Sequence, residues 1–141
     1  MADQDSTDDP TIANEDPLWR RIFHRWWVLD KNLQPPRKRL SSQAFEDSKD
    51  GTPCSVHLGK DATAAGVSAE SIMQRFPEHG MVSIPAGIAR ENGLGVVRHP
   101  DRNEPPNPED PFHAYLVGDK KRKACVELGE KAIWLVRLRE S

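Results

Sequence analysis

The sequence predicts one small domain of the α+β class: a mixed or mainly antiparallel sheet, with short helices packed on one side of it. The chain has 141 residues, of which 36% are hydrophobic, and this is enough for one compact core. Short apolar runs follow one another with only brief helical segments between them, which disfavours a doubly wound parallel sheet. The 12 prolines predict many loops and short strands.

The first 15 residues are expected to form a disordered acidic tail in front of a domain that spans residues 16–141. Residues 1–17 contain six acidic residues, no Lys or Arg, and few large apolar side chains. Such a segment buries too little apolar surface to offset the entropy of ordering it. The remainder holds 20 cations and 16 acids, so the domain is mildly basic. A tail of this charge would shield the basic face until a partner displaces it.

The domain is expected to begin with a helix over residues 17–24, which leads into an extended segment near residues 25–29. Asp16 and Pro17 suit the N-cap and the first helical position. Leu18 and Ile22 then recur at helical spacing, and larger apolar residues widen that face. The double proline at 35–36 breaks regular structure, and residues 46–53 are expected to form a turn.

Beyond residue 50 the pattern predicts five strands and three helices. Strands are expected over residues 54–58, 81–84, 94–97, 112–117 and 132–138, and helices over residues 69–76, 86–92 and 119–130. Ser68 is the expected N-cap of the first of these helices, and Gly93 suits the left-handed position that closes the second. Residues 99–111, rich in proline, are expected to form a long exposed loop.

The sequence argues against membrane insertion and secretion. No run approaches the roughly 18 apolar residues that a membrane span needs. The N-terminus has neither the basic nor the apolar region of a secretory signal. We therefore expect a cytoplasmic protein without membrane contact, and two reduced cysteines, Cys54 and Cys125.

Two basic segments are candidate anion-binding sites. Guanidinium groups beside hydroxyl groups hold phosphate or carboxylate by paired hydrogen bonds. Cations in the first turn of a helix oppose its dipole, unless an anion lies among them and the free amides. A solvated basic loop and an ordinary charged surface are the simpler interpretations. The first segment comprises Arg37, Arg39 and Ser42 with the neighbouring Ser41, and the second comprises Lys120, Lys121, Arg122 and Lys123.

His113 is the candidate general acid or base. It lies in an apolar strand, with Tyr115 on the same face. With Ser41 or Ser55 and an arginine it would make a nucleophile–base pair, although a hydrogen-bonded histidine within a sheet is the plainer interpretation. No cofactor is expected.

No metal site is expected either. Cys54 and His57 have a Cys-x2-His spacing, but positions i and i+3 of a strand lie on opposite faces. The four tryptophans would stack on nucleobases beside arginines in a nucleic-acid-binding protein. Aromatic residues at this spacing are more often part of the core.

Several short motifs occur in a recognisable order. They are Arg39-x-Ser41-Ser42-x-Ala44-Phe45, then Cys54-Ser55-Val56, then Gly93-Leu94-Gly95-Val96-Val97 with Pro100, and finally His113-Ala114-x-x-x-Gly118. This layout resembles a family of small bacterial proteins to which we attach no activity. The resemblance covers most of residues 17–138. It implies that a shared site lies near Arg39, Ser41, Ser42, Ser55 and His113.

Three functions follow from these observations as expectations. The first is a non-enzymatic binding or accessory protein that acts through protein partners, with a bacterial defence or toxin-type operon as one setting. The second is a small enzyme that acts on a phosphate-bearing or nucleotide substrate through Arg39, Ser41 and His113. The third is a nucleic-acid-binding module.

Overall fold

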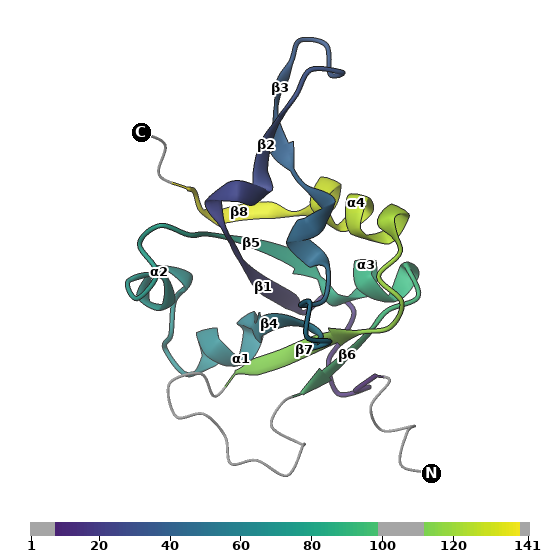
Figure 1. The fold of residues 1–141 in the computed structure, drawn as a ribbon. Helices are drawn as coiled ribbons and strands as arrows, with labels where there is room; N and C mark the ends of the chain where they lie inside the picture. Colours follow the sequence, from purple (N-terminus) through teal and green to yellow (C-terminus); the bar gives the residue numbers. More distant parts are fainter. Residues whose placement is uncertain (1–7, 99–111, 139–141) are drawn as a thin grey trace.

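A computed structural model describes residues 8–98 and 112–138 of the chain (Figure 1). Its centre is a six-stranded sheet in the order β6-β7-β4-β1-β5-β8, and every strand pairing in it is antiparallel. A separate two-stranded hairpin projects from this body. The central strands are β1 (Pro17–Ile22), β4 (Cys54–Leu58), β5 (Gly80–Pro85), β6 (Gly95–Arg98), β7 (His113–Val117) and β8 (Ile133–Val136); the hairpin is β2 (Trp27–Asp30) and β3 (Arg37–Leu40).

Four short helices cover both faces of the sheet, so the expectation of helices on one side is wrong. Side chains alternate along β1: Leu18 belongs to the core under α3 and α4, whereas Trp19 belongs to a smaller core under α1 and α2. Both faces therefore have a helical cover and an apolar layer. The helices are α1 (Gly59–Ala64), α2 (Ala69–Met73), α3 (Ala86–Glu91) and α4 (Arg122–Lys131), with two 3-10 turns, η2 (His24–Trp26) and η3 (Ser42–Phe45).

Residues 17–22 form the central strand β1, where a helix was expected. The spacing of Leu18 and Ile22 fits both a helix and a strand, since residues four apart share a face in either element. Pairing decides between them: β1 makes six register pairs with β5 and also pairs with β4. In the strand, the Trp19 side chain packs on the face of the sheet opposite to Leu18 and Ile22. The extended segment expected near residues 25–29 is present as η2 followed by β2.

Most elements after residue 50 agree with the expectation. The strand at 54–58 has the expected bounds, and Ser68 caps α2 by accepting a hydrogen bond from the Ser71 amide at 3.1 Å. Gly93 adopts the left-handed conformation, with φ of +81°. The elements β3, η3 and α1 were not expected from the sequence, and α4 begins at Arg122, later than expected. The expected loop at 99–111 lies outside the described residues.

Residues 8–16 form an N-terminal strap that packs against α3 and β6. Ile12 is 1% exposed and belongs to the main core. The amide of Asp9 donates to the Val96 carbonyl at 2.7 Å, and Arg90 donates to Asp8 at 3.1 Å. The structure thus differs from the expectation of disorder through residue 15, because one buried isoleucine and these polar contacts fix the strap. Residues 1–7 lie outside the described part.

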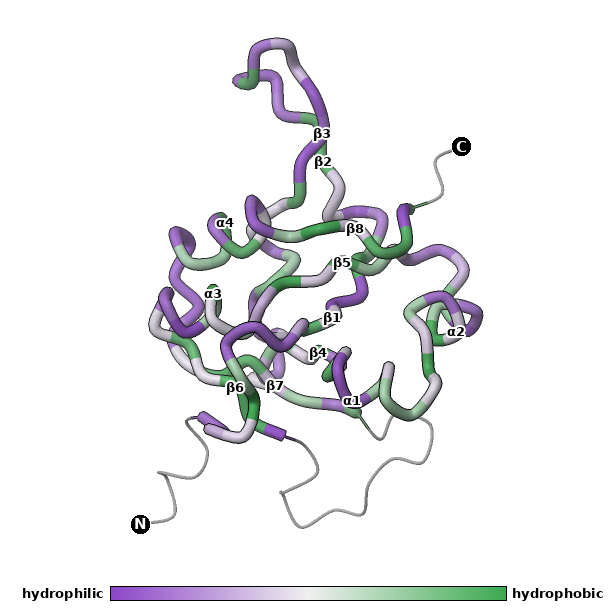
Figure 2. Tube along the Cα trace, turned by 180° about the vertical axis from the view of Figure 1, so that it is seen from behind, coloured by the Kyte–Doolittle hydropathy of each residue, from purple (hydrophilic) through white to green (hydrophobic). Residues whose placement is uncertain are grey.

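The two ends of the molecule differ in character. The strap and β6 lie at one end and the β2–β3 hairpin projects from the other, with β3 in hydrophilic colours (Figure 2). In the described residues, no helix is long and apolar enough to cross a membrane.

Candidate functional site

His113 and Ser55 lie on the same face of the central sheet. His113 is the register partner of His57 on β4, and His57 is in turn paired with Trp19 on β1. Ser55 pairs with Tyr115, whose ring makes an edge contact with the His113 ring at 4.8 Å between centroids. The structure therefore adds His57, a buried histidine, to the neighbourhood that the sequence analysis assigned to His113. Strand register is the signal that would have found it.

Ser41 lies away from this group, in the layer on the other side of the sheet. Its hydroxyl accepts a hydrogen bond from the Gln43 amide at 3.1 Å and so caps η3. That turn places Ala44 and Phe45 in the core under α4, on the face opposite His113. Ser42 begins the same turn. The structure does not bring Ser41 and His113 together, so it gives no support to a nucleophile–base pair between them.

The two basic segments have different surroundings. Arg37 and Arg39 lie on β3, where Arg39 forms an ion pair with Asp30 at 2.7 Å. Lys120 is only 5% exposed in its side chain and pairs with Asp47 at 2.8 Å. Because this lysine holds the η3 loop against the start of α4, its role is structural. The remaining members of the second segment, Lys121, Arg122 and Lys123, are exposed at the start of α4.

Both cysteines are buried free thiols. Burial raises the pKa of Cys54, and burial together with the charge of Glu46 raises the pKa of Cys125 to about 11. Thiols of this kind are poor nucleophiles near neutral pH. In residues 8–98 and 112–138 no group of three or more His, Cys, Asp or Glu side chains is arranged to hold a metal ion.

Strand β8 forms one edge of the central sheet and carries apolar side chains into solvent. Within the described chain it pairs with β5 alone, and no other backbone hydrogen bond joins its four residues. Ile133 is 67% exposed and Leu135 is 37% exposed. Edge strands usually carry charges, bulges or a cover that prevents pairing with other chains. A bulge is present between Met81 and Val82, yet the outward apolar pair remains.

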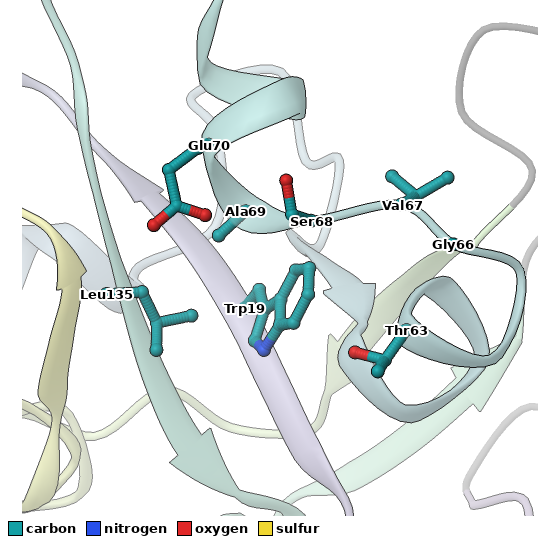
Figure 3. A pocket seen from close by; sticks show the side chains of 8 residues that line it. All are labelled: Trp19, Thr63, Gly66, Val67, Ser68, Ala69, Glu70 and Leu135. Atoms are coloured by element: carbon teal, nitrogen blue, oxygen red, sulfur yellow. The ribbon is translucent and has the colours of Figure 1, made fainter.

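Leu135 also lines a pocket of about 330 Å³ between β8, β1 and α2 (Figure 3). Trp19 lies at its centre, and the carboxylate of Glu70 points toward it from α2 (Figure 3). The indole is fixed in place because Gly59 leaves it room: a Cβ atom there would overlap the Trp19 ring. This site was not evident from the sequence, since four consecutive apolar residues at 133–136 are typical of a strand buried on both faces.

A second pocket, of about 290 Å³, lies beside α2 and is lined by His79, Phe76 and Arg137. The His79 ring stacks on Phe76 and meets the edge of Phe23. Burial and the charge of Arg21 lower its pKa. The buried Nδ1 has no hydrogen-bond partner among the described residues. The imidazole is therefore neutral near pH 7 and packs as an aromatic ring.

Comparison with known proteins finds no matching family model, no matching curated protein and no matching solved structure.

Proposed function

We propose that the chain is a protein-binding module that adds an extended segment of a partner protein to the outer edge of β8. The observation that carries this proposal is the exposed apolar pair Ile133 and Leu135 on an edge strand. Strand addition uses the unpaired backbone groups of an edge for affinity and alternate side chains for specificity. The alternative chemistry, a Ser41–His113 pair, has less support, because Ser41 caps a turn that packs on the side of the sheet opposite to His113.

The pocket beside Leu135 supplies specificity. A strand added to β8 would lie about 4.8 Å from it, and every second side chain of that strand would face the α2 side. A long apolar side chain at such a position would cross Leu135 and enter the mouth of the pocket toward Trp19. We therefore expect the partner segment to carry large apolar residues at alternate positions.

The charges at the ends of β8 define the flanks of the partner segment. Lys131 precedes the strand and Arg137 follows it, and both side chains are exposed. Acidic residues on either side of the apolar centre would complement them. With a strand of four residues the contact is small, so we expect a transient complex.

A peptide selection tests this proposal. Random peptides of about 12 residues are displayed and selected against the full chain. We expect enriched peptides with alternating large apolar residues and acidic flanks. Their affinity should fall at least about tenfold for Leu135→Glu, because the carboxylate opposes apolar burial. The matched control is Leu29→Glu, which changes an exposed leucine on the hairpin and should leave affinity unchanged.

Backbone N-methylation of a selected peptide separates strand addition from simple apolar adhesion. Methylation of the amides that face β8 should abolish binding, whereas methylation of the intervening amides should be tolerated. The proposal would be overturned if methylation were tolerated equally at every amide of the peptide. It would also be overturned if the peptide bound the Leu135→Glu variant as tightly as the parent, or if the selection enriched no common sequence pattern. A stable dimer that is lost in Ile133→Lys would assign the edge to a second copy of the chain and would also count against it.

A further inference from the structure

The β2–β3 hairpin is the most basic projecting feature of the described chain. Residues 27–40 contain four cations and one acid, and we refer to them as the basic hairpin. All four cationic side chains are exposed. The tip of the hairpin projects from the body of the molecule (Figure 1), while Trp27 at its base contacts Trp134 of β8. The cations are Lys31, Arg37, Lys38 and Arg39, and the acid is Asp30.

Strand pairing distributes these cations over both faces of the hairpin. In the strand register, Arg37 lies opposite Asp30, and Lys38 lies opposite Leu29. Because side chains alternate along a strand, Arg37 and Arg39 share one face and Lys38 lies on the other. The ion pair between Arg39 and Asp30 leaves the first face with a net positive charge. Exposed cationic side chains on both faces suit a partner that surrounds the hairpin with anions on two sides.

We propose that the basic hairpin enters the major groove of duplex DNA and contacts the phosphates on both of its walls. The major groove is about 12 Å wide and admits a two-stranded β-ribbon. Strands of four residues extend about 13 Å, which is enough to cross the groove depth of about 8.5 Å. The proposal is independent of the protein-binding edge at β8. The proposed contacts are to phosphates, which supply affinity without selecting a sequence.

The base of the hairpin adds a further cation. Arg25 of η2 is exposed, and its guanidinium lies over the Phe23 ring at 5.0 Å and near the Trp26 ring at 5.9 Å. These rings hold the guanidinium at the foot of the hairpin, where it would meet a phosphate beside the groove. The aspartates of the strap lie at the opposite end of the molecule (Figure 1) and do not neutralise this surface.

Fluorescence anisotropy with a labelled DNA duplex of about 20 base pairs tests the proposal, with the full chain as titrant. With about three phosphates neutralised, the affinity should fall about 40-fold between 50 and 200 mM salt. The double variant Arg37→Ala with Lys38→Ala should weaken binding at least tenfold at low salt and flatten the salt dependence. Thermal unfolding of the variant should match that of the parent, because both side chains are exposed.

The chain offers a matched control for charge alone. The double variant Lys121→Ala with Lys123→Ala removes the same charge from the exposed start of α4 and should change affinity less than about twofold. An equal loss in this control would show that only net charge matters and would overturn the proposal. Tighter binding to single-stranded DNA of the same length, or to polyglutamate, would also overturn the proposal. The absence of binding to the duplex at 50 mM salt would do the same.

Discussion

The two ends of the molecule use the same residue type in opposite ways. At the strap end, Arg90 donates to Asp8, to the Asn14 side chain at 2.7 Å and to the Asp9 carbonyl at 3.0 Å. There arginine joins a terminal segment to the domain. In the basic hairpin, Arg39 pairs locally with Asp30, but all four cationic side chains remain exposed and none joins a buried segment. The difference teaches that burial and local acceptors, and not residue identity, decide whether an arginine stabilises the fold or presents charge.

The largest expected effect is on the strap. Replacing Ile12 with Ala should lower the free energy of unfolding by about 2–4 kcal/mol, since it removes a side chain that is 1% exposed and leaves a cavity. The matched change in the hairpin, Leu29→Ala, should cost less than about 0.5 kcal/mol because Leu29 is 55% exposed. Urea unfolding measures both. Equal values for the two variants would mean that the strap is not part of the cooperative core.

A smaller effect is expected from the arginines themselves. Arg90→Ala removes three hydrogen bonds to the strap and should cost about 1.5–3 kcal/mol. Arg37→Ala in the hairpin should cost less than about 0.5 kcal/mol. Both changes remove one positive charge, so net charge is controlled. A hairpin variant as destabilised as the Arg90 variant would remove the contrast between the two ends.

The smallest effect concerns acid stability. Burial works to raise the pKa of Asp9, but hydrogen bonds from Thr11 and the charge of Arg98 hold it below its ordinary value of 3.8. A carboxylate with a lowered folded-state pKa stabilises the fold above its ordinary pKa, and this contribution is lost as the pH falls through the lower, folded-state value. Asp9→Asn should therefore lose less thermal stability than the parent on acidification below about pH 4. Identical pH profiles would contradict a stabilising role for the ionised Asp9.

The fold class was predictable because local patterns survive in the structure. Strand 54–58 alternates cleanly, and the Ser68 cap and the Gly93 turn are local signals that tertiary packing does not override. Residues 17–22 were not predictable in this way, because their apolar spacing satisfies both a helix and a strand. Pairing with β4 and β5, which are distant in sequence, selects the strand. The strap was missed because a single isoleucine in an acidic segment carries little weight in composition.

The candidate sites were predictable only in part. The basic character of residues 37–39 was evident, but their place on a projecting hairpin depends on β2 as a partner. The proximity of His57 to His113 depends on strand register, which no local pattern specifies. The exposed edge at β8 depends on strand order: the same apolar residues in an interior strand would be covered on both sides.

The position of β1 has a consequence for synthesis of the chain. Among the described strands this one is made first, yet it occupies the middle of the sheet and pairs with strands that end at residues 58 and 85. Its partners do not exist until much of the chain has left the ribosome. Such non-local pairing slows folding to the range of milliseconds to seconds. During that interval, Leu18, Trp19 and Ile22 are uncovered, and a nascent chain stalled before residue 80 would display them to chaperones.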